Sequence, residues 1–257
     1  MATVLGLQCL NCEKEFEERT LFDGCPHCKN ETFSSNVIPL YDYRKMKNGI
    51  SETLLHQPAK GLWSFKEWLP VNEKYIVTLH EGGTPLLKSS LGEEWGVENL
   101  YLKDESRNPT HSFKDRLAAV GISKAKEIGA KTVVVSSTGN HGAATAAYAA
   151  QAGLECIIFT TKSIPGTLNV FMQVYGARVL ALSDSYERWT IMKQCVDEYG
   201  WFPVSNYMYP PVGSNFYGIE GYKTIAFEIC ADLTWKAPHK VVVPTAYGDG
   251  LSGIWRG

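Results

Sequence analysis

Short apolar segments alternate with longer helical segments through the middle of the chain. The apolar segments have the length of buried strands, and the segments between them have the length and apolar spacing of helices. This alternation is typical of crossover units, in which helices cover a parallel sheet. The expected strands are 99–105, 132–137, 155–161 and 177–182, and the expected helices are 112–128, 143–153, 165–175 and 186–199. The sequence therefore predicts an α/β fold.

The pattern resumes after a loop rich in tyrosine and proline at 206–215. A helix is expected at 217–233 and a strand at 240–245, which leads into a glycine-rich stretch at 246–253. Residues 41–70 mix aromatic residues, prolines and short helical stretches without a clear period. We see no internal repeat in the chain.

Two glycine-rich turns follow expected strands, "SSTGNHG" at 136–142 and "TAYGDGLSG" at 245–253. An open α/β sheet binds ligands at the carboxyl ends of its strands. A glycine-rich turn there exposes backbone N–H groups that commonly hold phosphate. The alternative is that each is only a turn, with Thr138 capping the helix that follows it.

Composition and charge narrow the class of protein. Hydrophobic residues make up 44% of the 257 residues, enough for a packed core, and the formal net charge is −2 without a basic cluster. This balance predicts neither nucleic acid nor a membrane as partner. The first residues do not resemble a secretory signal, and no run of about 18 apolar residues occurs. Together with seven cysteines, an odd number, these features predict a cytoplasmic protein with reduced thiols.

Four of the cysteines form two pairs near the N-terminus. Cys9 and Cys12 are separated by two residues, as are Cys25 and Cys28, which is the spacing of a zinc ribbon. Four thiolates leave no open coordination position, so the predicted zinc is structural. The alternative is a ribbon with free thiols, because Glu13 and Lys29 stand where each pair is usually followed by glycine.

Several motifs occur together in the order of a known family. They are "EGGTPLL" at 81–87, "NPTHSFKDR" at 108–116, "SSTGNHGAATAAYAAQAGL" at 136–154 and "VVVPTAYGDGLSGIWRG" at 241–257, preceded by the ribbon. The chain therefore resembles the pyridoxal-phosphate enzymes of the threonine-synthase type, which have fold type II and are related to the tryptophan synthase β subunit.

The resemblance implies a two-lobed α/β fold with parallel sheets. Residues 1–40 would form the zinc-ribbon-like segment and 116–213 the small lobe. Residues 41–115 and 214–257 would form the large cofactor-binding lobe. Family members continue beyond this point, so the large lobe is expected to lack its C-terminal part, including the group that contacts the pyridine nitrogen.

The resemblance also assigns the site. Lys114 would be the Schiff-base lysine and the catalytic base, since burial favours the neutral amine that this chemistry needs. The other cofactor-binding residues would be Phe113, Asn140 at the phenolic oxygen, and Ala246, Tyr247, Gly248, Asp249 and Gly250 at the phosphate. The substrate would contact Thr84, Ser137, Thr138, Gly139 and His141.

Some positions depart from the family pattern. Gly213 and Gly218 stand where threonine synthases carry a serine and an arginine that hold the substrate's phosphate, and His111 replaces a glycine. The asparagines usual in the phosphate loop are replaced here by Tyr247 and Asp249, whose carboxylate must point away from a phosphate.

The implied function is elimination or replacement of a substituent on a small amino acid, up to conversion of O-phosphohomoserine to threonine. One alternative is a related ammonia-lyase or β-replacement enzyme that acts on serine, threonine or diaminopropionate. Another is an inactive relative that keeps the fold. The resemblance implies a homodimer.

Overall fold

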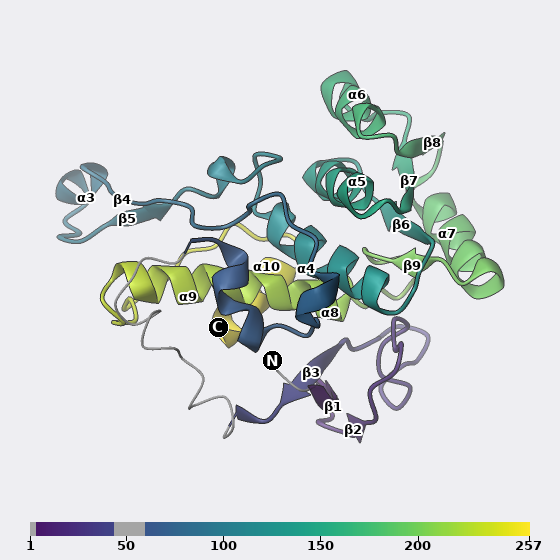
Figure 1. Cartoon of the computed structure of the whole chain (residues 1–257), viewed down its shortest axis with the longest axis horizontal. Helices are drawn as coiled ribbons and strands as arrows, with labels where there is room; N and C mark the ends of the chain where they lie inside the picture. The colour runs from purple at the N-terminus through teal and green to yellow at the C-terminus, as the bar shows by residue number, and fades with distance from the viewer. Residues whose placement is uncertain (1–3, 44–59) are drawn as a thin grey trace.

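The computed structural model describes residues 4–43 and 60–257, and its largest sheet has four parallel strands, on the right-hand side of Figure 1. The spatial order is β8-β7-β6-β9, and every neighbouring pair is parallel. The strands are β6 (Thr132–Ser136), β7 (Glu155–Thr161), β8 (Arg178–Leu182) and β9 (Phe202–Pro203). The strands predicted at 132–137, 155–161 and 177–182 are confirmed.

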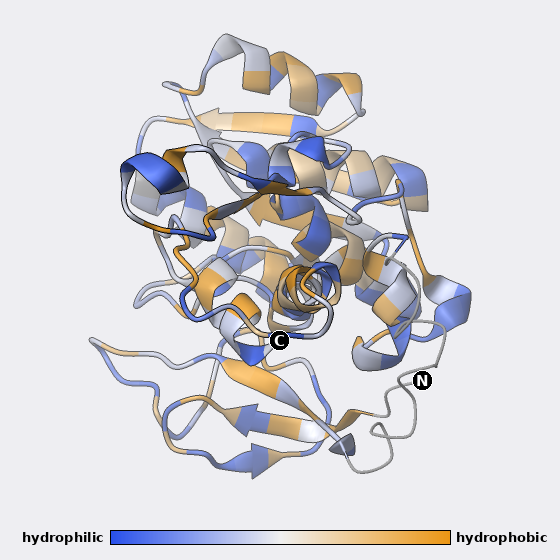
Figure 2. Ribbon diagram, turned by 90° about the vertical axis from the view of Figure 1, so that its left-hand side faces the viewer, coloured by the Kyte–Doolittle hydropathy of each residue, from blue (hydrophilic) through white to orange (hydrophobic). Residues whose placement is uncertain are grey.

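Helices cover both faces of this sheet, as Figure 1 shows. On one face lie α5 (Asn140–Ala152) and α6 (Gly166–Val174), with α4 (Lys114–Glu127) packed on α5, and on the other lies α7 (Ser185–Tyr199). Side chains alternate between the faces: Val133 packs with α4 and α5, whereas Val134 packs beside Met192 of α7. The strands of this sheet are accordingly mostly hydrophobic, with polar residues at their ends (Figure 2). The four predicted helices of this region are confirmed.

The helix predicted at 217–233 consists of three consecutive segments. These are α8 (Phe216–Ile219), the 3₁₀ helix η4 (Glu220–Tyr222) and α9 (Lys223–Asp232). They pack against α4, and α10 (Asp249–Arg256) packs in turn against α9.

The strand predicted at 240–245 is wrong. This stretch has no regular secondary structure, and the side chain of Val242 is 94% exposed. A strand exists only through hydrogen bonds to a neighbour, and no strand of the described residues lies beside it. Its apolar composition was typical of a strand, but composition does not supply a partner.

A separate hairpin carries the strand predicted at 99–105. It pairs β4 (Leu86–Lys88) with β5 (Tyr101–Lys103), joined through α3 (Leu91–Glu94), and extends away from the body as an arm (Figure 1). Three short 3₁₀ helices flank it, η1 (Leu62–Trp68), η2 (Glu73–Tyr75) and η3 (Glu105–Arg107). The short helical stretches expected in 41–70 are confirmed at η1, whereas 44–59 lie outside the described residues.

The N-terminal segment forms a small antiparallel sheet in the order β2-β1-β3. Its strands are β1 (Val4–Cys9), β2 (Glu15–Phe16) and β3 (Val37–Tyr41). Leu7 and Val37 pack against Phe216 and Tyr217 of α8, so this ribbon is attached to the body by an apolar contact of its own. Among the described residues, no helix combines the length and the hydrophobicity that a membrane span requires.

Candidate functional site

A cavity of about 510 Å³ opens beyond the carboxyl ends of the parallel strands. It lies where the start of α4, the β6–α5 turn, the start of α7 and two loops meet. Its lining residues are Phe113, Lys114, Ser136, Ser137, Thr138, His141, Arg188, Trp189, Ser205, Asn206, Gly213, Ser214 and the whole stretch 244–250. The structure thus brings together most of the residues that the sequence predicted for the site, from segments more than one hundred positions apart.

Lys114 is the first residue of α4, and its side chain enters this cavity. Its Nζ lies 4.9 Å from the centroid of the Phe113 ring and 5.7 Å from that of Tyr222. Among the described residues it has no hydrogen-bond or ion-pair partner. Burial lowers the pKa of Lys114, while the negative charge of Asp249 acts in the opposite direction. The neutral, nucleophilic amine is therefore more accessible here than on a surface lysine.

Two polar atoms on the cavity wall are buried without a partner among the described residues. They are Ser136 Oγ and His141 Nε2. Burial, and then the charge of Lys114, hold the pKa of His141 well below its usual range, so the ring is neutral. Buried polar groups without a partner are uncommon in folded proteins, so these two atoms are available to a ligand bound in the cavity.

The β6–α5 turn is held by Ser137 rather than Thr138. Ser137 Oγ accepts the N–H groups of Gly139 and Gly142 at 3.1 and 3.0 Å. The alternative prediction that Thr138 caps this helix is wrong, because the serine lies closer to the free N–H groups. Thr138 is instead exposed on the cavity wall, whereas Gly139 and Asn140 are absent from the lining.

The glycine-rich turn at 246–250 leads directly into α10. Gly248 has φ 87°, a left-handed conformation that favours glycine, and the helix begins at Asp249. The first N–H groups of a helix have no partner within the helix, so this turn is suited to an anion. The Asp249 carboxylate accepts the backbone N–H of Ser214, at 3.2 Å from Oδ2 and 3.4 Å from Oδ1.

Thr84 lies outside the cavity, in a buried ionic network. Its hydroxyl donates to Glu105 at 2.6 Å and accepts from Arg116 at 3.2 Å. Arg116, fully buried, donates twice to Glu105 and twice to Glu228 at 2.7–2.8 Å. Arg116 is two residues after Lys114, so this network holds the first turn of α4 in place.

The positions that depart from the family pattern have distinct environments. Gly213 borders the cavity with φ 112°, but Gly218 lies within α8, where an added Cβ would approach Leu117 to 3.0 Å. His111 has φ 59°, which explains why glycine suits that position. Local geometry therefore favours glycine at all three positions, including 111, where histidine stands.

The sequence did not identify Arg188, Trp189, Ser205 and Asn206 as site residues. All four follow the carboxyl ends of β8 and β9, and Asp184 starts α7 by accepting the N–H of Glu187. Their position after strands could have indicated a role in the site, because the carboxyl ends of parallel strands meet at the edge where ligands bind.

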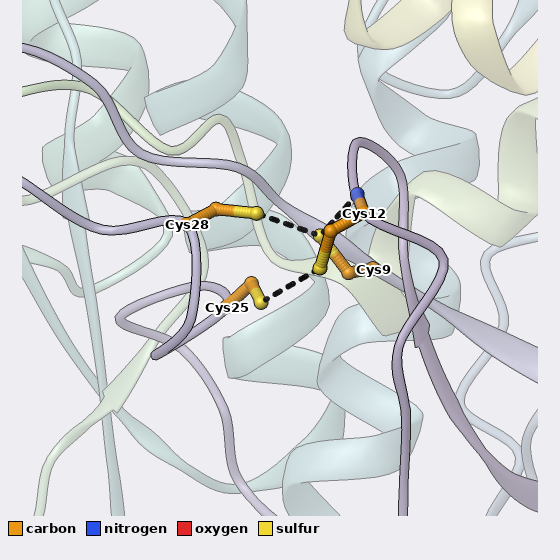
Figure 3. A group of neighbouring side chains, drawn as sticks. All are labelled: Cys9, Cys12, Cys25 and Cys28. Atoms are coloured by element: carbon orange, nitrogen blue, oxygen red, sulfur yellow. Dashed lines mark hydrogen bonds between the residues drawn. The ribbon is translucent and has the colours of Figure 1, made fainter.

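The four N-terminal cysteines form a second candidate site. Their sulfur atoms all lie within 4.8 Å of one another, with Cys9–Cys28 at 3.6 Å and Cys12–Cys25 at 3.8 Å (Figure 3). Two Zn–S bonds of about 2.3 Å at a tetrahedral angle separate the sulfurs by about 3.8 Å, so the four fit one metal ion. Glu13 adopts φ 58°, as the glycine expected there would, but Lys29 is not left-handed.

Comparison with known proteins decides the family. A protein-family model described as "Pyridoxal-phosphate dependent enzyme" matches residues 77–257. The chain belongs to this family. The predicted family and α/β fold are confirmed.

Curated relatives of this pyridoxal-phosphate-dependent enzyme chain include threonine synthases. That of Methanocaldococcus jannaschii is 37% identical over 255 residues, covering 97% of this chain and 60% of the relative. That of Halalkalibacterium halodurans is 39% identical over 199 residues, covering 76% and 54%. The chain thus spans about three fifths or less of the length of these relatives.

Solved structures show the same fold. Maize serine racemase has a TM-score of 0.57 and 27% identity, over 66% of this chain and 50% of that one. A pyridoxal 5'-phosphate-dependent aspartate racemase has a TM-score of 0.58 and 25% identity, over 77% and 58%.

Proposed function

We propose that the cavity binds pyridoxal phosphate, with Lys114 as the residue that holds it covalently. The observation that carries the proposal is the convergence of a buried amine, the unpartnered Ser136 and His141 atoms, and a helix N-terminus in one cavity. When bound, the cofactor supplies an electron sink for a carbanion at the substrate's α-carbon. Phe113 packs beside the lysine, and Asn140 lies next to His141 at the start of α5, the position proposed for the phenolic oxygen.

The protein groups have separate proposed tasks. The lowered pKa of Lys114, caused by its burial, suits Nζ to remove the substrate's α-proton at neutral pH. The residues 137–139 would orient the substrate's carboxylate with backbone N–H and hydroxyl groups, and neutral His141 can donate or accept on the same wall. The turn 246–250 would hold the cofactor's phosphate at the start of α10. Thr84 would act indirectly, through the Arg116 network that fixes α4.

The proposed reaction is elimination or replacement on a small amino acid, as in the threonine synthases to which the chain is similar. Arg188 favours a substrate with an anionic side chain, because it brings a positive charge to the cavity wall. O-Phosphohomoserine is therefore the first substrate to test.

A second candidate is elimination or ammonia-lyase chemistry on an unphosphorylated amino acid. The observation in its favour is Gly218, which offers no side chain to a phosphate and packs on α4 instead. Turnover of O-phosphohomoserine, serine, threonine and diaminopropionate under one set of conditions separates the two candidates. An inactive relative would turn over none of them.

Borohydride reduction tests the cofactor assignment. The protein should gain an absorption band near the visible edge with pyridoxal phosphate, and reduction followed by peptide mass mapping should find the adduct on Lys114. Lys114→Ala should lose the band, whereas Lys126→Ala should keep it, since Lys126 is exposed on the same helix. An adduct on another lysine, or no band at all, contradicts the assignment.

We further propose one structural zinc ion on Cys9, Cys12, Cys25 and Cys28, supported by their sulfur spacing. We propose that 116–213, which contains the parallel sheet, is the small lobe, that 41–115 with 214–257 is the large lobe, and that 1–40 is the ribbon. A reducing, cytoplasmic compartment suits a chain whose seven cysteines form no disulfide. We also propose a homodimer, as the resemblance implies.

A further inference from the structure

The ribbon reaches the cavity wall through one buried amide, that of Asn36. Its Nδ2 donates to the carbonyl oxygen of Ser214 at 3.0 Å, and its Oδ1 accepts the N–H of Val37 at 2.9 Å. Because Val37 N–H can only donate, the orientation of the amide is fixed, with its NH₂ group toward Ser214. The side chain therefore joins β3 to the loop before α8.

The backbone of Ser214 lies between Asn36 and Asp249. Ser214 gives its carbonyl to Asn36 and its N–H to the Asp249 carboxylate. A Cβ on Gly213 would lie 3.0 Å from Asp249 Oδ1 and 3.1 Å from Asn36 Nδ2, at φ 112°. Only glycine permits this approach, so the three groups form one close-packed contact.

Asp249 is the residue whose position matters for an anionic ligand. It directly follows Gly248 in the turn to which the proposed function assigns the cofactor's phosphate. A free carboxylate there would repel the phosphate. The Asp249 carboxylate instead accepts a hydrogen bond from the N–H of Ser214, and Asp249 borders both the first cavity and a second cavity of about 440 Å³ that Asn36 also lines.

Asn36 is fixed in turn by the cysteine segment. Leu10 N–H donates to the carbonyl of Asn36 at 3.1 Å. The carbonyl oxygen of the neighbouring Ser35 accepts the N–H of Cys25 at 2.8 Å, and the Ser35 hydroxyl lies 3.4 Å from Cys9 Sγ. The position of the amide therefore follows from the fold of the ribbon.

We propose that Asn36 is a positioning residue of the cofactor site. It holds Ser214 by its carbonyl oxygen, so that the N–H of Ser214 keeps the Asp249 carboxylate hydrogen-bonded and away from the phosphate. This inference rests on the proposed function, because it requires a phosphate at the turn 246–250. It gives the ribbon a task in cofactor binding.

The test measures two dissociation constants, for pyridoxal phosphate and for pyridoxal, which lacks the phosphate. Asn36→Ala should weaken binding of pyridoxal phosphate about tenfold and change that of pyridoxal less than about twofold. Asn36→Leu, which keeps the approximate size but cannot donate to Ser214, should act in the same way and serves if the alanine variant does not fold. Both constants come from tryptophan fluorescence quenching.

Adding Asp249→Asn isolates the cause. With the negative charge removed, Asn36→Ala should cost less than about twofold in pyridoxal phosphate affinity. Asn30→Ala is the matched control: its Oδ1 accepts only from Thr32 and Phe33 within the ribbon, so the constants should not change.

Equal loss of affinity for both compounds, or a loss that persists with Asp249→Asn, would show that Asn36 only stabilises the fold and would overturn the inference. A different result marks failure of the proposed function: the unsubstituted protein would then bind no pyridoxal phosphate, and both proposals would fall.

Discussion

Replacing Arg116 with methionine should destabilise the protein strongly. The guanidinium is fully buried and lies 2.7–2.8 Å from carboxylate oxygens of Glu105 and Glu228. Methionine has a similar volume but leaves both carboxylates without this partner. Removing one member of a buried ion pair costs about 3–5 kcal/mol, because the remaining charge stays desolvated.

The pKa of Glu228 gives an independent magnitude. Burial raises this pKa, but hydrogen bonds and charge from Arg116 outweigh it and hold the pKa at about 2, below the ordinary 4.5. A shift of this size corresponds to about 3 kcal/mol. Because the folded pKa is depressed, this stabilisation is complete above pH 4.5 and is lost as the pH falls toward 2. The variant lacks most of it, so the difference between the two proteins should shrink with acidification.

Urea unfolding followed by circular dichroism, at pH 7 and again at pH 4, measures both effects. At pH 7 Arg116→Met should lose about 3–5 kcal/mol. Arg178→Met is the matched control, since Arg178 and Glu155 form an exposed ion pair at 3.3 Å, worth less than about 1 kcal/mol. A loss below about 1 kcal/mol for Arg116→Met at pH 7 would refute the reasoning.

Three further predictions concern separate parts of the molecule. Cys25→Ser should reduce zinc from about one ion per chain to near zero by metal analysis, whereas Cys230→Ser, outside the cluster, should not. Arg188→Ala should raise the KM for O-phosphohomoserine at least about tenfold and leave that for serine within about twofold; equal effects on both would exclude recognition of the side-chain phosphate. Asp184→Ala removes the cap of α7 and should cost about 1 kcal/mol in urea unfolding, and no loss would show that solvent replaces the cap.

The alternation of apolar and helical segments was sufficient to predict the parallel sheet and its helices. Runs such as Thr132–Ser136 are buried on both faces, so their composition alone marks them as strands. The same logic failed at 240–245, because pairing depends on a neighbouring strand. The hydrophobic pattern of a sequence therefore predicts which segments are buried better than it predicts which strands pair.

The sequence predicted those parts of the candidate site that lie within short contiguous motifs. Lys114 and the turn at 246–250 were found from adjacent residues and do meet in one cavity. Arg188 was missed because its position depends on the start of α7 relative to three other segments. Ser137 rather than Thr138 caps α5 for a similar reason, since one residue of offset decides which oxygen reaches the free N–H groups.

The attachment of the ribbon has a consequence for how such chains diverge. Lys124, near the end of α4, pairs with Glu18 of the ribbon at 2.9 Å and lies over the Tyr217 ring, and Phe216 is covered by Leu7 and Val37. If a lineage lost the cysteine segment, a buried cation and two aromatic rings would become exposed at once. Relatives without the four cysteines should therefore carry small or polar residues at positions 216 and 217. Gain or loss of the ribbon should then appear as correlated substitutions at these two positions.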